Sequence, residues 1–208
     1  MSRILLAGAA TAAAIPLYLK YGRPAVLNWG ATEAEVHAAL PGDDVLEKVA
    51  IQTTRAITVN TGPAQIWPWL LQMGPRPRAG VYTYDWIERL IGLDIENSDR
   101  ILPEFQHLEA GDYIGLNEKQ GLKVLEVQAE RALVLQWEPA GSTWTFVLQA
   151  EGASTRLLSR NLIPGGGPGF WLGMVALMEP GSLVMERKML LGIKERAEKL
   201  AAKTSVSP

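Results

Sequence analysis

Five segments in the second half of the chain alternate apolar and polar residues, which is the pattern of strands with one buried face. These segments cover residues 112–116, 122–129, 132–138, 143–149 and 156–163. Short turns separate them, for example the stretch from Pro139 to Ser142. Within the third segment Leu133, Leu135 and Trp137 point to one side, so one face of the sheet is apolar. The spacing predicts an antiparallel meander.

Earlier in the chain the pattern is mixed. Thr32 followed by Glu35 forms a capping-box signature, and Pro41-Gly42 ends the short helix that it begins. A strand is predicted over residues 54–59 and a helix over 64–73, with Pro63 near its first turn. Another short helix is predicted over residues 85–90.

The last segment of the chain predicts an amphipathic helix. Apolar residues recur there at helical spacing, at Met185, Met189, Ile193, Ala197 and Leu200. Charged residues, Glu186 among them, occupy the other faces. Such an apolar stripe is expected to pack against the apolar face of the sheet.

Composition limits the classes of function. The 208 residues, 48% of them hydrophobic, fit one substantial domain with one core. The formal net charge of -2 and the scattered basic residues argue against nucleic acid as a partner. The chain has no cysteine, and its two histidines, His37 and His107, are far apart. We therefore expect no metal site and no cofactor.

The amino-terminal end has a different character. Residues 4–19 carry no charge and would extend about 24 Å as a helix, slightly less than the roughly 30 Å of a bilayer core. Three interpretations remain open: a membrane anchor, a signal peptide cleaved near Ala12–Ala14, or a helix packed on the domain. The basic flanks favour an anchor with a cytoplasmic domain; export after cleavage is the alternative. The predicted division is 1–23 for this segment, 24–203 for the folded domain and 204–208 for a tail.

Several short motifs carry a resemblance to a known family. They are WGAT (29–32), LPGD (40–43), IWPWLLQMG (66–74), AGVYTYDWIE (79–88), DRILPEFQ (99–106), GDYI (111–114) and MERKMLLGIKERAE (185–198). With the order of elements, they make the chain similar to an uncharacterised bacterial branch of the SRPBCC superfamily, which includes START-like and polyketide cyclase/dehydrase-like proteins. The resemblance implies the α+β helix-grip fold, in which a curved antiparallel sheet wraps around a long C-terminal helix.

The same resemblance implies a cavity between sheet and helix for a small hydrophobic molecule such as a lipid, isoprenoid or polyketide-like compound. The expected ligand-binding residues are aromatic, methionine and polar side chains on the segments that would surround it. They are Trp67, Trp69, Arg76, Tyr82, Tyr84, Asp85, Trp86, Gln136, Trp137, Trp144, Arg160, Met185 and Met189. For Arg160 the alternative is a solvated position on the outer face of the sheet.

Two other functions remain open. A cyclase or dehydratase would use Tyr82, Tyr84, Asp85, Glu88 and Glu104 for acid/base work, with Arg76 or Arg78 holding an enolate or carboxylate. No catalytic constellation is recognisable in the sequence, so no catalytic residue is assigned. The third hypothesis is a protein-interaction module in which the cavity has no ligand.

Overall fold

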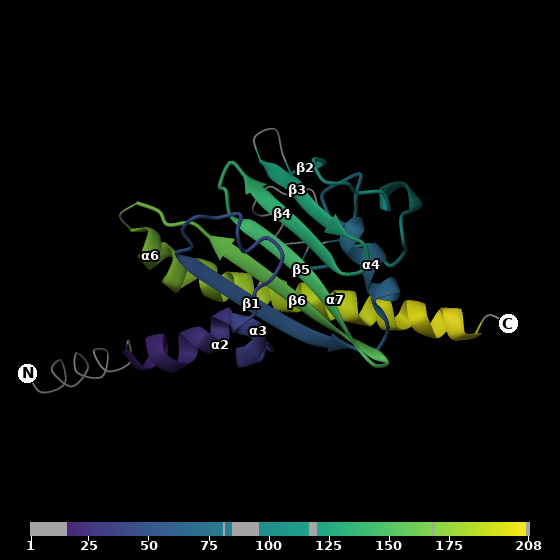
Figure 1. Cartoon of the computed structure of the whole chain (residues 1–208), viewed down its shortest axis with the longest axis horizontal. Helices are drawn as coiled ribbons and strands as arrows, with labels where there is room; N and C mark the ends of the chain where they lie inside the picture. The colour runs from purple at the N-terminus through teal and green to yellow at the C-terminus, as the bar shows by residue number, and fades with distance from the viewer. Residues whose placement is uncertain (1–15, 81, 85–95, 117–119, 168, 207–208) are drawn as a thin grey trace, which may run out of the picture.

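The computed structural model describes residues 16–80, 82–84, 96–116, 120–167 and 169–206, and it contains a six-stranded antiparallel sheet. The strands are β1 (Ile51–Val59), β2 (Tyr113–Gly115), β3 (Gly121–Gln128), β4 (Ala132–Glu138), β5 (Thr143–Glu151) and β6 (Ser154–Ile163). Their order is β1-β6-β5-β4-β3-β2, as Figure 1 shows. The predicted meander and the predicted early strand are confirmed.

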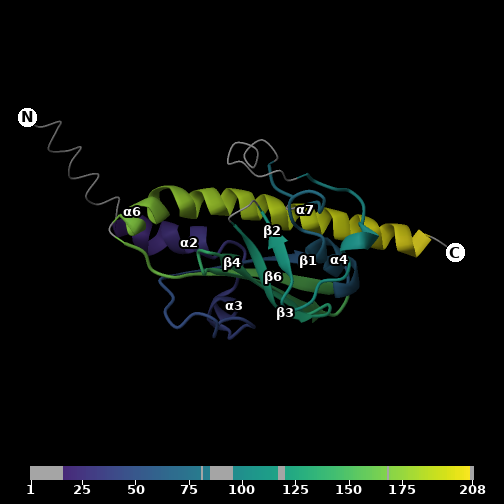
Figure 2. The same ribbon diagram turned by 90° about the horizontal axis from the view of Figure 1, so that it is seen from above.

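Helices lie on both sides of this sheet. They are η1 (Tyr18–Gly22), α2 (Arg23–Leu27), α3 (Glu33–His37), α4 (Pro63–Leu71), η2 (Pro103–Phe105), α6 (Phe170–Gly173), η3 (Met174–Met178) and α7 (Glu179–Val206). Figure 2 shows α7 along one face of the sheet and α3 on the opposite side. The predicted α+β helix-grip architecture is confirmed. The helix expected at residues 85–90 lies outside the described residues.

The main core fills the space between the sheet, α4 and α7. Leu135, Phe146 and Leu157 of the sheet belong to the same buried cluster as Leu190 and Ile193 of α7. None of these five side chains is more than 2% exposed. Each contributes about 2 kcal/mol by leaving water, so this layer is a principal source of stability. Of the predicted apolar stripe on the last helix, Met189, Ile193 and Ala197 are buried, whereas Met185 and Leu200 are half-buried.

A second, smaller core covers the other face of the sheet. Leu40 packs there with Ala56, Val147 and Leu158. The adjacent Gly42 has a φ of 83°, and a Cβ atom at this position would lie 2.6 Å from Val134 Cγ1. The LPGD motif therefore lays the chain closely against β4, where only glycine fits.

The predicted capping box is present at the start of α3. The backbone N–H of Glu35 donates to Thr32 Oγ1 at 3.2 Å, and the backbone N–H of Thr32 donates to Glu35 Oε2 at 2.6 Å. Arg156 of β6 also binds the Glu35 carboxylate, with Nε 2.6 Å from Oε1 and Nη2 3.0 Å from Oε2. The Arg156 guanidinium and the capping bonds together lower the pKa of Glu35 below its ordinary value of 4.5, although burial opposes them.

We predict that Glu35→Gln destabilises the protein by about 1 kcal/mol at pH 7 because it removes a charged bidentate partner of Arg156. Since the pKa of Glu35 is lower in the folded protein, its stabilisation is present above the unfolded-state pKa and is lost as pH falls through the folded-state value. Urea unfolding of both proteins from pH 7 to pH 3 should show the difference shrinking. Glu33→Gln, in the same helical turn, is the control; an equal and pH-independent loss in the two variants would contradict the prediction.

The amino-terminal prediction needs correction. No helix in the part of the chain that the structure describes combines the length and the apolarity needed to cross a bilayer. This finding contradicts the predicted membrane span over residues 4–19 and the membrane location inferred from it. Residues 1–15, including the possible signal-cleavage site, lie outside the described residues.

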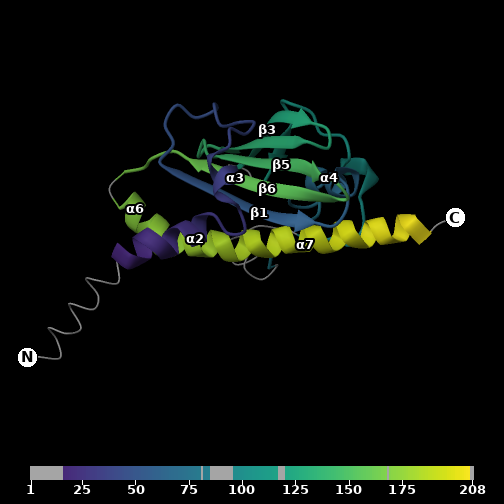
Figure 3. The ribbon, with the colours of Figure 1, turned by 60° about the horizontal axis from the view of Figure 1, so that its bottom comes forward.

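The described end of that segment is instead held on the domain. Arg23, the first residue of α2, binds Glu179 at the start of α7 through Nε at 2.9 Å and Nη2 at 2.7 Å. Figure 3 shows α2 beside the N-terminal part of α7. The Glu179 side chain is only 1% exposed, so its carboxylate depends on Arg23 for compensation.

Candidate functional site

A cluster of polar side chains lies between the sheet and the N-terminal half of α7. Arg55 of β1 and Glu186 of α7 form an ion pair, and both residues are buried. The hydroxyl of Ser159 on β6 donates to the same carboxylate. Asn161 places Nδ2 3.3 Å from Thr53 Oγ1 and 3.4 Å from both oxygens of Glu186. This polar cluster joins β1, β6 and α7 through groups that an apolar core would exclude.

Arg55 also fixes the neighbouring helices. Its Nε and Nη2 atoms donate to the carbonyl oxygen of Val26, near the end of α2, at 3.3 and 3.2 Å. Nη2 donates in addition to Ser182 Oγ of α7 at 3.0 Å. One guanidinium thus connects a strand with two helices, which explains how a fully buried cation is tolerated.

Two tryptophans stand beside the polar cluster on the face of the sheet that α7 covers. The rings of Trp137 on β4 and Trp144 on β5 stack with centroids 6.1 Å apart and planes 18° apart. Trp144 Nε1 donates to Ser159 Oγ at 2.9 Å, which connects the pair to the polar cluster. Both tryptophans are only half-buried, whereas Leu135 and Phe146, farther along the same face, are buried. The sheet therefore presents a partly open aromatic surface at this end.

Several predicted site residues belong to the main core instead. Trp67 and Trp69 of α4 and Met189 of α7 are all less than 9% exposed and pack in the same cluster. Met185, one helical turn before Met189, is half-buried. The structure thus brings Trp67, Trp69 and Met189 together, but away from solvent.

Tyr82 is buried where α4, the following loop and α7 meet. Gln72 Nε2 donates to the Tyr82 hydroxyl at 3.2 Å, and that hydroxyl donates to the Trp69 carbonyl oxygen at 3.4 Å. Burial raises the pKa of this phenol, with the hydrogen bond from Gln72 acting in the opposite direction. A phenol with a raised pKa stays protonated at neutral pH, which argues against Tyr82 as a general base.

Gln136 and Arg160 lie on the face of the sheet opposite α7. The Gln136 amide donates to the Gly141 carbonyl oxygen at 3.2 Å in its own hairpin. Arg160 pairs with Asp43 at 2.6 Å and is only 2% exposed. Neither residue borders the space between sheet and α7, and Arg160 is buried rather than solvated.

The remaining predicted residues lie at the surface or beyond the described chain. Arg76 pairs with Glu96 at 2.9 Å, and both side chains are more than half exposed. The exposed Tyr84 ring lies 5.9 Å from Nζ of Lys188 on α7. Asp85 and Trp86 lie outside the described residues, so their assignment stays a prediction.

Sequence reasoning missed Arg55 and Glu186, the central pair of the polar cluster. In the sequence, each of these charged residues lies on an apolar side of its element. Arg55 shares its side of the strand with Ile57 and Val59, and Glu186 precedes Met189 and Leu190 by one helical turn. A charge within an apolar stripe on each of two elements indicates a buried pair. Only the fold shows that these two positions, 131 residues apart, meet.

Comparisons with known proteins give a likeness of architecture. No protein-family model matches the chain, and no curated protein matches it significantly. Cgl2372 of Corynebacterium glutamicum, described as polyketide cyclase-like, is similar at a TM-score of 0.44 and 9% identity, over 76% of this chain and 96% of that one. The Aha1 protein of Colwellia psychrerythraea is similar at a TM-score of 0.42 and 15% identity, over 71% of this chain and 96% of that one. The Mesorhizobium loti protein MLL2253 is similar at a TM-score of 0.40 and 18% identity, over 74% of this chain and 98% of that one.

These values describe similarity of shape and carry no argument about function. The arrangement of strands is established without these comparisons. Strand β1 lies beside β6, the meander continues to β2, and α7 packs on one face of the sheet. By the order and pairing of its elements, the chain has the α+β helix-grip fold that the sequence analysis predicted.

Proposed function

We propose that the protein binds a small, largely apolar molecule, such as a lipid, isoprenoid or polyketide-like compound, against the half-buried Trp137–Trp144 pair. The observation that supports this proposal most is the contrast along one face of the sheet. The α4 end is filled by core side chains, while the opposite end leaves two stacked indoles partly exposed. Aromatic surface of this kind gains free energy when a ligand covers it.

The adjacent polar cluster orients the bound molecule. Asn161 is half-buried, and its Oδ1 atom accepts no hydrogen bond from any described residue. A ligand hydroxyl can donate to this oxygen while its apolar body lies on the indoles. Because Arg55 already compensates the Glu186 carboxylate, the cluster offers no free cation to a ligand carboxylate. The proposed site therefore favours neutral, hydroxyl-bearing molecules over fatty acids.

A fluorescence titration with farnesol, an apolar alcohol, tests the proposal. We expect saturable quenching of tryptophan emission, and we expect Trp137→Phe and Trp144→Phe to weaken binding about threefold to tenfold because each loses indole surface. Trp171→Phe is the matched control, since Trp171 is an exposed tryptophan on α6. Native mass spectrometry of the full chain should also show a co-purifying apolar molecule.

Two results would overturn the proposal. One is the absence of saturable binding together with protein that purifies without any apolar molecule. The other is an equal loss of farnesol affinity in Trp144→Phe and Trp171→Phe, which would place the binding away from the Trp137–Trp144 pair.

A further inference from the structure

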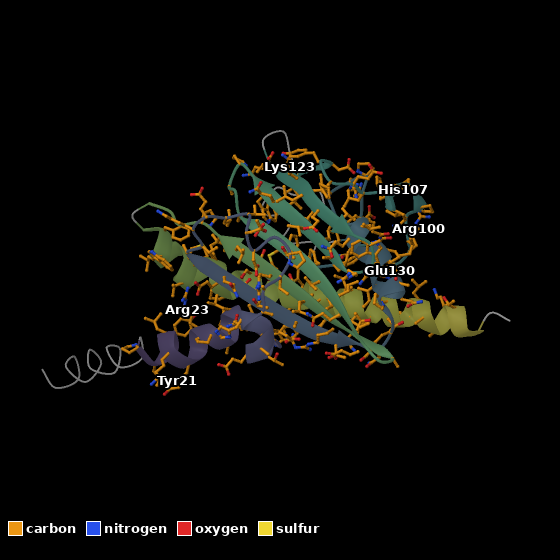
Figure 4. The ribbon with its side chains drawn as sticks, viewed as in Figure 1. Tyr21, Arg23, Arg100, His107, Lys123 and Glu130 are labelled. Carbon is orange, nitrogen blue, oxygen red and sulfur yellow. The ribbon has the colours of Figure 1, made fainter. Side chains whose placement is uncertain are left out.

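A surface cleft of about 600 Å³ lies at the α4 end of the molecule, away from the Trp137–Trp144 pair. Residues 76–79 form one wall, and residues 96–104 supply the other. Three arginines, Arg76, Arg78 and Arg100, line it together with Glu96 and Glu104. Figure 4 labels Arg100 at this end of the molecule, near α4. The volume lies within the range of small-molecule sites.

Arg78 is the most informative of these residues because it is half-buried and no carboxylate among the described residues pairs with it. Its Nη1 atom donates to the Leu71 carbonyl oxygen at 2.8 Å, and its Cζ atom lies 5.0 Å from the centre of the Phe105 ring. Burial lowers the pKa of this guanidinium, and the charge of Asp112 offsets that effect only in part. A desolvated cation with neutral contacts is stabilised when an anion approaches.

The charged residues that line the cleft, Arg78 included, leave an excess of one positive charge. Arg76 is paired with Glu96. Arg100 is exposed, and no carboxylate of the described residues binds its guanidinium. Three arginines against Glu96 and Glu104 give a net charge of +1. This balance suits a ligand with one anionic group and disfavours polyanions.

Hydrogen bonds from Gln72, Arg196 and Gly80 fix the walls of the cleft. Gln72, which is fully buried, donates from Nε2 to the Arg100 carbonyl oxygen at 3.2 Å and accepts the Leu102 N–H at 3.0 Å. Arg196 of α7 donates to the Ser98 carbonyl oxygen at 2.7 Å. The Gly80 N–H donates to the Glu96 carbonyl oxygen at 2.6 Å and so joins the two walls. A cleft fixed in this way loses little entropy on binding.

We propose that this cleft is a second binding site, which takes a small organic molecule carrying one carboxylate or phosphate group and holds that group with Arg78 and Arg100. The planar guanidinium is suited to both oxyanions, because its parallel N–H groups match two oxygens. The site is independent of the proposed apolar one.

Isothermal titration calorimetry of the full chain with benzoate and phenyl phosphate tests this proposal, with benzyl alcohol as the uncharged comparison. We expect one or both anions to bind and benzyl alcohol not to bind, and the two anions together identify the preferred oxyanion. Arg78→Gln and Arg100→Gln should each weaken binding about tenfold or more, since each removes a charged hydrogen-bond donor. Arg131→Gln, which changes an exposed arginine in the turn between β3 and β4, should leave the affinity unchanged.

The proposal is overturned if neither anion binds, if benzyl alcohol binds as tightly, or if Arg100→Gln retains the affinity of Arg131→Gln. Arg100→Gln still tests the proposal if Arg78→Gln fails to fold, because the Arg100 side chain is exposed and its guanidinium forms no hydrogen bond or ion pair with a described residue. Farnesol affinity in Arg100→Gln should stay at the unmodified level, so failure of one site is distinguishable from failure of the other.

Discussion

Arg55→Met should be among the most destabilising substitutions in this protein, with a loss of about 3–5 kcal/mol in the free energy of unfolding. The change removes the cation that compensates Glu186 in the buried polar cluster. It also leaves the Val26 carbonyl oxygen and the Ser182 hydroxyl without the donor that Arg55 supplies. Urea denaturation at pH 7 measures the loss directly.

The double variant Arg55→Met/Glu186→Leu separates the charge from the packing. If the cost of the single change comes from an uncompensated carboxylate, replacing both partners should recover at least half of it. Lys199→Met is the matched control, because Lys199 and Glu195 form an exposed pair on the same helix, and it should cost less than about 0.5 kcal/mol. A double variant no more stable than Arg55→Met would show that charge compensation is not the reason.

The sequence predicted the strands well because their physical causes are local. Alternation placed the meander, and the capping box placed the start of α3, where Thr32 and Glu35 exchange both predicted bonds. The final helix shows the limit of local reasoning. Its stripe predicted the burial of Met189 and Ile193, but Glu186 was assigned to a polar face. The buried position of Glu186 depends on Arg55. Each segment shows a charge within an apolar stripe, but neither pattern identifies the residue on the other segment as its partner.

The candidate site was harder to predict for the same reason. Aromatic residues near position 67 were expected to line a cavity, yet Trp67 and Trp69 fill the core under α4. Trp137 and Trp144 have the same chemistry but lie where no further element buries them fully. Composition cannot separate these cases, because the exposed fraction of an aromatic ring is set by its tertiary neighbours.

For Arg160, strand alternation predicted the face of the sheet correctly but not the environment of the side chain. Strand alternation placed it with Leu158 and Leu162, and that face is the one opposite α7. The alternative of a solvated position was wrong because residues 35–43 cover the guanidinium. The LPGD motif supplies part of this cover, since the Asp43 carboxylate accepts both from Arg160 and from the Leu40 N–H.

All five N–H groups of Arg160 have an acceptor, and this geometry leads to the second large prediction. Nε donates to Thr54 Oγ1 at 3.0 Å, and Nη1 donates to Asp43 Oδ2 and to the Ala38 carbonyl oxygen at 2.6 and 2.8 Å. Nη2 donates to the carbonyl oxygens of Glu35 and Val36 at 2.8 and 3.0 Å. Three of the acceptors are carbonyl oxygens at the end of α3, where a helix leaves such groups unpaired.

Arg160→Met should therefore lower the free energy of unfolding by about 3–5 kcal/mol, since it removes the donor to the Glu35 and Ala38 carbonyl oxygens and the cation that pairs with Asp43. Arg160→Lys should recover less than half of that loss, because an ammonium group offers three donors from one point and cannot reach acceptors arranged around a planar fork. Urea denaturation gives both values, and Arg131→Met, at an exposed turn, should change stability by less than about 0.5 kcal/mol. Hydrogen exchange should also increase over residues 35–43 in both Arg160 variants. A lysine variant as stable as the unmodified protein would mean that positive charge alone, rather than the five-bond geometry, holds α3 against the sheet.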